Sequence, residues 1–447
     1  MSKILKNVKE SFELLKCLRL PYRIGFVQGH SHLNDNQLLQ IKQVLDLNQN
    51  NKIITDYERQ YSSLIGFGYG VSFAAGRMAF YMLIKTLGIG RGDEVILPGF
   101  TCSVMPNAVW RTGAIPVFSD IDQETYGSDA GEIEKKITTR TKLIVAQHSF
   151  GIPCNIPAIT GVGKKYGIFV IEDCAIALDS SINGVKVGNW GDAAIFSTDH
   201  SKPLNTIIGG LLYTKNKTLY EKIKELSVNL PHLDKFHQKR LFKQFLFERN
   251  NYTPSRYPRA ILKNYFRLFA SKIRPGHSKS TYLVGDYRKH TSANSHYPYP
   301  AKMPPFLAQL GLFELERWNS EKLRRKNLLK NYLCIIKQTV FNRYLPKAYF
   351  NPNLDIVPLR FIFKCPHSEK LMKKMGKFID INSIWFRTPI ICCPEGPESL
   401  GYTLGSCLIA EEICESIINW PCILPDGWDL KILENFQRIT NNNLVFH

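Results

Sequence analysis

The sequence predicts an α/β fold in which a mostly parallel sheet carries helices on both faces and is followed by a smaller α+β C-terminal domain. Short apolar runs alternate with helical segments over the first half of the chain, and polar residues come directly after several of these runs. Such β-α-β alternation is typical of parallel sheets covered by helices. A long helical pattern from residue 305 to about residue 337 then leads into the second domain.

The elements are expected in a regular order. Residues 33–71 read as two helices with a polar break, because their apolar positions recur at helical spacing. Strands are expected over residues 71–75, 93–98, 115–118, 142–146, 168–171 and 193–196, and helices over residues 76–87, 105–111 and 157–166. In the second domain, strands are expected over 356–363 and 384–386, with a helix over 368–379 between them.

Polar residues follow two of the expected strands and are the first candidates for a site. The run 168–171 ends in Glu172 and Asp173, and the run 193–196 ends in Ser197, with Lys202 five residues later. Ligands of open α/β sheets lie at the carboxyl ends of the strands, so these side chains could converge on one molecule. An acid, a hydroxyl and an amine suit pyridoxal 5'-phosphate, in which the lysine supplies a Schiff base and the acid keeps the pyridine nitrogen protonated.

Each of these residues also has an ordinary interpretation. Taken singly, Asp173 is an acid in a loop after a strand and Lys202 is a solvated surface lysine. Upstream, the small residues Ala74 and Ala75 precede Gly76 at a helix start, where free backbone N–H groups form a phosphate cradle in principle. Many α/β turns contain glycine for packing reasons alone, so it is the combination that favours a cofactor site.

The composition is that of a globular protein with an unusual charge. Hydrophobic residues make up 44% and charged residues 21% of 447 residues. The eleven cysteines are scattered without CxxC pairs, which predicts a reduced, cytoplasmic setting and no metal site. No signal peptide is expected in the charged N-terminus, and no apolar stretch approaches the roughly 20 residues of a membrane-spanning helix.

The net charge of +20 is concentrated between residues 215 and 289, which hold 18 basic and 5 acidic residues, a balance of +13. Such an excess attracts nucleic acid, an anionic membrane surface or phosphorylated substrates. No nucleic-acid motif accompanies it, so no nucleic-acid partner is predicted. A solvated basic insertion is the first interpretation, and attraction of a nucleotide sugar or lipid phosphate is the next. The amphipathic segment 259–275 could contact a membrane surface, although packing on its own domain is favoured.

Several ordered segments resemble the DegT/DnrJ/EryC1/StrS family of pyridoxal-phosphate-dependent nucleotide-sugar aminotransferases. The matching segments are Ala75-Gly76, LGIGRGDEVILPGFT, AIPVFSDID, HSFG, GIFVIEDCA, GDAAIFS with Lys202, Gly209-Gly210, the helix LAQLGLFELERWNSEKLRRKNLLKNYL and CESIINWPCILP. They cover about residues 33–213 and 297–440. The resemblance implies an aspartate-aminotransferase-like (type I) fold and a homodimer with each active site at the subunit interface.

The resemblance also implies a role for individual residues. Lys202 is the expected catalytic residue, which binds the cofactor and moves protons during transamination. Asp173 is expected to pair with the pyridine nitrogen. Ser197 and the backbone at Gly76, Arg77 and Met78 are expected to hold the phosphate. The substrates implied are a nucleotide-linked keto-sugar and an amino donor, expected to be glutamate.

Some positions depart from the family's pattern. The aromatic residue that stacks on the cofactor ring is replaced by Cys102, and the polar residue three positions after the acid is Ile176. The glutamate before Gly209 is Ile208. Arg77, where the family usually has threonine, could pair with the phosphate or form a salt bridge elsewhere. The element that a partner subunit offers keeps one cation, Lys302, in YPYPAK.

The function predicted is a pyridoxal-phosphate-dependent aminotransferase acting on a nucleotide-linked keto-sugar in cell-surface polysaccharide, lipopolysaccharide or amino-sugar biosynthesis. It is expected to be cytoplasmic, with possible peripheral contact to the inner face of the membrane. The rivals are a related sugar dehydratase and a catalytically silent homologue that binds a nucleotide sugar. One branch of the family replaces the lysine by histidine and performs dehydration, but here Lys202 is present and His200 is expected to be a loop residue.

The predicted organisation has three parts. They are an N-terminal helical arm (1–52), a large cofactor-binding domain (53–295) that contains the basic insertion at about 215–295, and a long helix with a C-terminal small domain (296–447).

Overall fold

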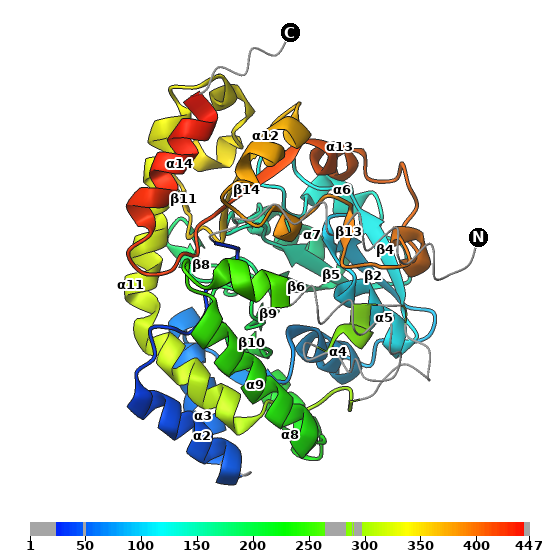
Figure 1. Ribbon diagram of the computed structural model, residues 1–447. Coiled ribbons are helices and arrows are strands. Elements are labelled where there is room, and N and C mark those ends of the chain that lie inside the picture. The colour runs from blue at the N-terminus through cyan, green and yellow to red at the C-terminus, as the bar shows by residue number, and fades with distance from the viewer. Residues whose placement is uncertain (1–23, 48–50, 264–282, 288, 290–296, 442–447) are drawn as a thin grey trace, which may run out of the picture.

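A seven-stranded sheet lies at the centre of the molecule (Figure 1). The structure is a computed structural model that describes residues 24–47, 51–263, 283–287, 289 and 297–441. The strand order is β1-β10-β9-β6-β5-β2-β4, and β10 runs antiparallel to both of its neighbours while the other pairs are parallel. The strands are β1 (Tyr69–Phe73), β2 (Glu94–Pro98), β4 (Ile115–Ser119), β5 (Thr141–Gln147), β6 (Phe169–Asp173), β9 (Ala193–Ser197) and β10 (Gly210–Thr214). The mostly parallel α/β sheet predicted from the sequence is confirmed.

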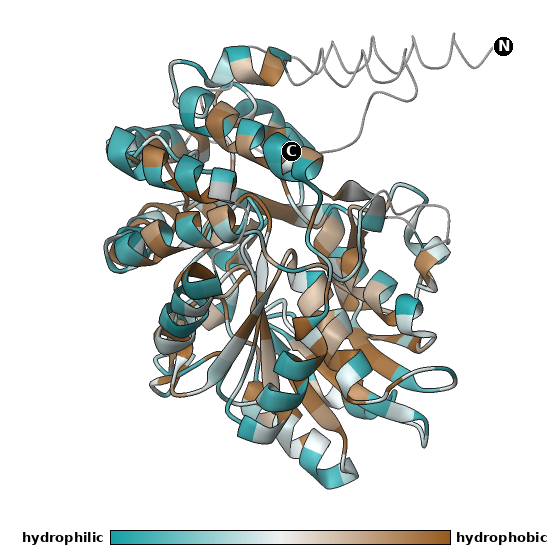
Figure 2. Ribbon diagram, turned by 90° about the horizontal axis from the view of Figure 1, so that it is seen from below, coloured by the Kyte–Doolittle hydropathy of each residue, from teal (hydrophilic) through white to brown (hydrophobic). Residues whose placement is uncertain are grey.

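Both faces of the sheet are covered because alternate residues of the strands point to opposite sides. In β2, Val95 and Leu97 belong to the main hydrophobic core, whereas Ile96 belongs to a second cluster with Ile144 of β5. The main core includes residues of α4 (Gly76–Thr86) and α5 (Val104–Thr112). The second cluster includes residues of α6 (Ala130–Glu134) and α7 (Ile156–Tyr166). Figure 2 shows the strands lying between helices, with hydrophobic residues along them.

A long helix, α11 (Pro305–Ile336), lies along one side of the molecule (Figure 1). The N-terminal helices α2 (Asp35–Leu47) and α3 (Asn51–Ile65) pack on it, and so does the C-terminal helix α14 (Asp429–Asn441). The remaining short elements are β3 (Thr101–Cys102), β7 (Ser181–Ile182), β8 (Val185–Lys186), β11 (Leu354–Asp355), β13 (Ile390–Ile391), η2 (Val340–Tyr344), η3 (Lys347–Phe350), η4 (Ile381–Ser383) and η5 (Pro397–Leu400).

The C-terminal part is α+β as predicted, but one of its strands lies elsewhere. β12 (Arg360–Lys364) pairs antiparallel with β14 (Ile417–Pro421), and α12 (Ser368–Met375) and α13 (Leu408–Ser416) are its helices. The strand expected over 384–386 is absent from this described segment. Phe386 has a φ of 59°, a left-handed conformation that a strand does not accommodate, and the Trp385 amide donates to the side chain of Asn419 in β14.

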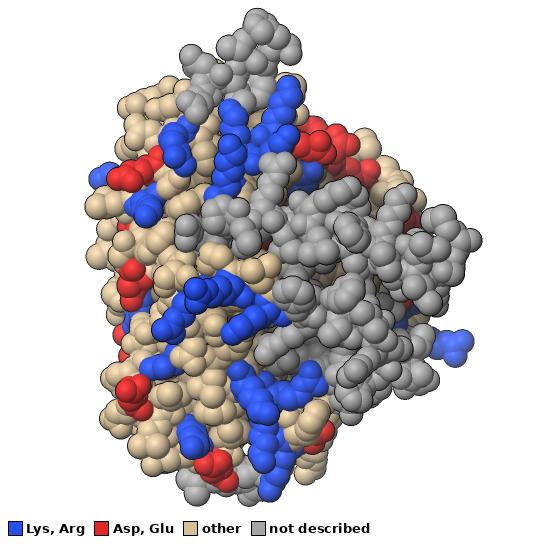
Figure 3. Space-filling view, viewed as in Figure 1, with Lys and Arg blue, Asp and Glu red and all other residues tan. Residues whose placement is uncertain are grey.

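The basic region after β10 forms two helices, α8 (Lys217–Val228) and α9 (Lys235–Asn251). Basic side chains gather over these helices on the face shown in Figure 3. The next described element is the short helix η1 (Val284–Tyr287). Most of the amphipathic segment 259–275 lies outside the described residues. Among the helices that are described, none combines the length and apolar character needed to cross a membrane.

Candidate active site

A cleft of about 460 Å³ lies at the carboxyl ends of the parallel strands. Strands β6 and β9 end in this cleft, and α4 begins there. The register pairs Asp173 of β6 with Gln147 of β5 on one side and Ile195 of β9 on the other. Six of the eight residues predicted from the sequence line the cleft: Gly76, Arg77, Cys102, Asp173, Ser197 and Lys202.

Lys202 lies on a loop that is shaped by hydrogen bonds on both sides of it. The Thr198 amide donates to the Gly209 carbonyl, and the two hydroxyls of Thr198 and Thr206 lie 2.6 Å apart. The Lys202 ammonium lies 4.6 Å from the ring centroid of Trp385, and it forms no ion pair with any of the residues that the structure describes. This amine therefore faces the cleft without a carboxylate of its own.

Asp173 is buried at the bottom of the cleft, with an exposed fraction of 5%. Its carboxylate accepts a hydrogen bond from the Ala175 amide at 3.0 Å. Burial raises the pKa of this carboxyl group above its ordinary value, although the amide and the charge of Lys202 oppose the rise. A cationic partner in the cleft would offset that cost of burial.

The neighbouring acid, Glu172, points to the other side of the strand and has a structural role. It accepts hydrogen bonds from the backbone amides of Gly188, Trp190 and Gly191, and His148 lies 3.1 Å from it. His148 and Glu172 could form a metal site with Cys174, but the acid is already saturated by donors of the chain. A second such group, His30, His32 and Glu314, lies outside the cleft.

The start of α4 faces Ser197. A Cβ atom placed on Gly76 would lie 3.1 Å from the Cβ of Ser197, and one on Gly210 would collide with the backbone nitrogen of Gly76. This close approach requires glycine at position 210 and leaves little room for a side chain at position 76. The helix has no side-chain cap, so its first amides remain available to an anion. The Met78 amide is not one of them, because it donates to the Ala75 carbonyl at 3.0 Å, and the Met78 side chain is buried in the core.

The Arg77 side chain adopts the second of its two predicted alternatives, a salt bridge. Its Nε lies 2.5 Å from Asp286 of η1, and its Nη2 donates to the Leu283 carbonyl. Asp286 also pairs with Arg111 of α5 at 2.9 Å. The guanidinium thus anchors the end of the basic insertion beside the cleft, and its charge is shared with an acid of the chain.

Two cysteines lie at the rim of the cleft. Cys102 precedes α5, and β3 pairs in parallel with β13, so Cys392 lies next to it. The neighbouring thiol of Cys392 lowers the pKa of Cys102 to about 7, assisted by the Val104 amide and the charges of Lys202 and Arg77, while burial opposes the shift. Phe100 does not replace the missing aromatic residue, because its ring is fully buried and stacks on Phe386 with centroids 4.0 Å apart.

Lys302 does not lie in this cleft of the single chain. Its ammonium donates to the Val228 carbonyl at 2.5 Å and lines a second cleft of about 410 Å³ beside α3 and α8. The expected contact of Lys302 with a cofactor across a subunit interface stays a prediction.

Sequence reasoning missed several residues that line the cleft. They are Phe26 and Val27 of the N-terminal arm, Tyr287 of η1, and Arg360, Asn382 and Ser383 of the C-terminal part. Trp385 and Arg387 of the C-terminal part also line it. His200 lines the cleft between two acids, with its ring nitrogens 3.7 Å from Asp199 and 3.6 Å from Glu248.

The donor set of the cleft fits pyridoxal phosphate. An unpaired amine, a buried acid and a hydroxyl next to an uncapped helix start are the three kinds of group that such a cofactor needs at its carbonyl, its ring nitrogen and its phosphate. Asp173 ends β6, Ser197 ends the neighbouring strand β9, and Lys202 lies on the loop after β9, so that all three meet in one cleft.

Comparison with solved structures defines the class of fold. A Streptococcus pneumoniae protein solved in its PLP form superimposes with a TM-score of 0.67 at 19% identity over 94% of this chain and 98% of that one. An aminotransferase from Psychrobacter cryohalolentis gives a TM-score of 0.66 at 18% identity over 91% and 97% of the two chains. The molecule therefore has the aspartate-aminotransferase-like, type I α/β fold.

Comparison of sequences defines the family. Residues 32–241, slightly less than half of the chain, match the model of the DegT/DnrJ/EryC1/StrS aminotransferase family. A GDP-perosamine synthase of Escherichia coli O157:H7 is 38% identical over 169 residues, which are 38% of this chain and 46% of that protein. A UDP-N-acetyl-3-dehydro-alpha-D-glucosamine 3-aminotransferase of Acidithiobacillus ferrooxidans is 41% identical over 170 residues, 38% of this chain and 46% of that protein. The matches thus span slightly less than half the length of these relatives.

Proposed function

We propose that the protein is a pyridoxal-phosphate-dependent aminotransferase that acts on a nucleotide-linked keto-sugar. The observation that carries this proposal is the convergence of Lys202, Asp173 and Ser197 in one cleft beside the start of α4. The family of residues 32–241 and the sugar-nucleotide names of the relatives support it.

Each of these residues of the cleft has a separate role in the proposed reaction. When bound, pyridoxal phosphate supplies an electron sink for the electrons released at the carbon that carries the amino group. Asp173 accepts a hydrogen bond from the ring nitrogen and keeps it protonated. Ser197 and the first amides of α4 bind the phosphate. Lys202 would hold the cofactor covalently at rest, and its amine, once displaced by the nitrogen of the amino donor, would take and return a proton at the reacting carbon.

The basic helices α8 and α9 favour an anionic substrate. Basic side chains gather over these helices on the face shown in Figure 3, and a concentrated positive field raises the encounter rate with a diphosphate. The amino donor proposed is glutamate. The assembly proposed is a cytoplasmic homodimer, in which Lys302 of one subunit reaches toward the cleft of the other.

Visible absorbance of the purified protein tests the proposal. Adding pyridoxal phosphate should produce an absorption band that the Lys202→Ala variant lacks, and adding glutamate should bleach it. A Lys202-dependent band that glutamate leaves unchanged would favour another donor or the sugar dehydratase. The absence of any band would exclude the enzyme and leave the nucleotide-sugar-binding homologue.

A further inference from the structure

The cleft contains a buried cation that the function above does not use. Arg360, the first residue of β12, has an exposed fraction of 2% and still lines the cleft. Its guanidinium carbon lies 3.7 Å from the ring centroid of Trp385 and 4.1 Å from that of Phe26. The N-terminal arm and the C-terminal part thus hold this guanidinium between two aromatic rings.

The hydrogen bonds of Arg360 leave one edge of its guanidinium free. Nη1 donates to the Ser383 carbonyl at 2.7 Å and to the Asn419 side chain at 3.0 Å, and both acceptors are neutral. Within the described part of the chain, no carboxylate lies within ion-pair distance of Arg360, and Nε and Nη2 have no acceptor. A planar guanidinium with one edge occupied can still form a two-pronged contact with one flat anion.

Burying a cation without an anion is unfavourable, and a second unpaired cation, the half-buried Lys202, lies close to Arg360. The Lys202 ammonium lies 4.6 Å from the same Trp385 ring that Arg360 contacts. The two charges are therefore no further apart than the sum of these two distances. Burial lowers the pKa of Arg360, which reflects this cost. The acids that face the cleft, Asp173 and Asp199, do not pair with it.

We propose that Arg360 binds a carboxylate of the substrate, with Trp385 and Phe26 fixing the plane of the guanidinium. This proposal rests on the function proposed above and adds the chemical class that the site selects. One free edge with two donors matches a carboxylate, and the contacts with the two aromatic rings restrict the orientation of the guanidinium.

Two molecules of the reaction could carry this carboxylate. The amino donor has an α-carboxylate one carbon from its nitrogen, so it could contact Arg360 while its nitrogen reacts near Lys202. The alternative is an acid group on the sugar itself. Matched pairs of ligands that differ only in the charge of one group distinguish the two sources.

Calorimetric titration of the protein loaded with pyridoxal phosphate provides a readout that does not depend on turnover. The donor pair is α-methyl-L-glutamate and its α-amide, and the sugar pair is UDP-glucuronate and UDP-glucose. We expect the wild type to bind the acid of one pair about 10- to 100-fold more tightly than its uncharged counterpart. Arg360→Met should abolish that preference, and Arg360→Lys, which keeps the charge but not the fork, should retain a part of it.

Arg387→Met is the matched control, because Arg387 lines the same cleft but is exposed and donates to Ser368. It should keep the preference. The proposal is overturned if neither pair shows a preference or if the preference survives in Arg360→Met. Failure of the aminotransferase itself is separate, since it appears as a missing absorption band in the wild type whatever the carboxylate preference is.

Discussion

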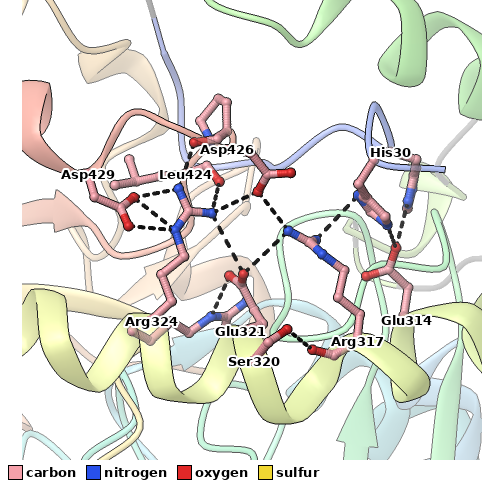
Figure 4. Close-up of polar contacts among 12 residues, drawn as sticks. His30, Glu314, Arg317, Ser320, Glu321, Arg324, Leu424, Asp426 and Asp429 are labelled. Atoms are coloured by element: carbon pink, nitrogen blue, oxygen red, sulfur yellow. Dashed lines mark hydrogen bonds and ion pairs between the residues drawn. The ribbon is translucent and has the colours of Figure 1, made fainter.

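Two groups of cations, each buried or half-buried, differ in how their charge is neutralised. On α11, Arg317, Arg324 and Arg325 lie within a network of acids (Figure 4). Arg325 pairs with Glu321 at 3.1 Å and Arg317 pairs with Asp426 at 2.9 Å. In the cleft, Lys202 and Arg360 instead contact aromatic rings and neutral acceptors.

This difference distinguishes the arginines of α11, which stabilise the fold, from Lys202 and Arg360, which are free to bind an anionic ligand. The α11 network joins the long helix to Asp426 and to Asp429 at the start of α14. Because these acids belong to the protein itself, the arginines keep their partners whether or not a ligand is bound. In the cleft, no acid of the described residues forms an ion pair with Lys202 or Arg360. A buried cation with an acid stabilises the fold only while both partners remain, whereas a buried cation without one predicts an anionic ligand.

The largest effect on stability is expected from breaking the α11 network. Glu321→Ala leaves the Arg325 guanidinium, which is 1% exposed, with the Pro203 carbonyl as its remaining acceptor. We expect the free energy of unfolding to fall by about 3–5 kcal/mol, because an uncompensated charge stays buried. Urea denaturation measures the change.

The matched control on the same helix is Lys326→Ala, which removes an exposed pair with Asp355 and should cost less than about 1 kcal/mol. In contrast, Arg360→Met should change the stability by less than Glu321→Ala does, since removing an unpaired buried cation relieves its desolvation. A larger loss for Arg360→Met than for Glu321→Ala would show that the two groups of cations do not differ in the way described.

A smaller, pH-dependent effect is expected where α11 meets the N-terminal arm. Glu314 lies 3.0 Å from the rings of both His30 and His32 (Figure 4). Burial opposes ionisation, but these contacts hold the pKa of Glu314 well below its usual value of 4.5. A carboxyl group with a lowered folded pKa contributes stability above its unfolded pKa, and this contribution is lost as the pH falls below about 4.5.

Glu314→Gln should therefore reduce the free energy of unfolding by about 1–2 kcal/mol at neutral pH. It should also flatten the loss of stability on acidification from about pH 5 to about pH 3. Urea denaturation at several pH values compares the two proteins. Parallel pH profiles for the variant and the wild type would contradict the assigned role of Glu314.

Asp173, Ser197 and Lys202 could be predicted from the sequence because their positions depend on short, nearby segments of the chain. Asp173 and Ser197 end strands that are visible as apolar runs, and parallel strands bring their carboxyl ends to one edge. Lys202 follows Ser197 closely in the chain. Their convergence needed the order of strands but no long-range side-chain packing.

The rest of the cleft depends on contacts between distant segments. Asp286 pairs with Arg77 across 209 positions, and Arg360 is placed by Phe26 of the arm and by Trp385. Nothing in the pattern around Arg360 distinguishes it from an ordinary residue at the start of a strand. The strand expected at 384–386 was wrong for the same reason, since packing against Asn419 overrides the local apolar pattern.

The smallest expected effect is on the reactivity of Cys102, which tests whether the unpaired charge of Lys202 lowers the pKa of a thiol at the rim of the cleft. Cys102 has a pKa of about 7, and the thiolate is the form that reacts with iodoacetamide. Its alkylation rate should rise with pH up to about 7 and then level off, as followed by mass spectrometry. Burial raises the pKa of Cys174 and Cys414 to about 12, so these residues should remain unmodified under the same conditions.

Variants then rank the causes of the lowered pKa. The thiol of Cys392 contributes most, so Cys392→Ala should shift the alkylation profile of Cys102 to higher pH by more than Lys202→Ala does. The shift in Lys202→Ala measures the charge that the cleft leaves unneutralised, because an ammonium paired with an acid would stabilise the thiolate far less. If Lys202→Ala leaves the profile unchanged, the charge of Lys202 is neutralised in solution, and the contrast with the α11 network holds for Arg360 alone.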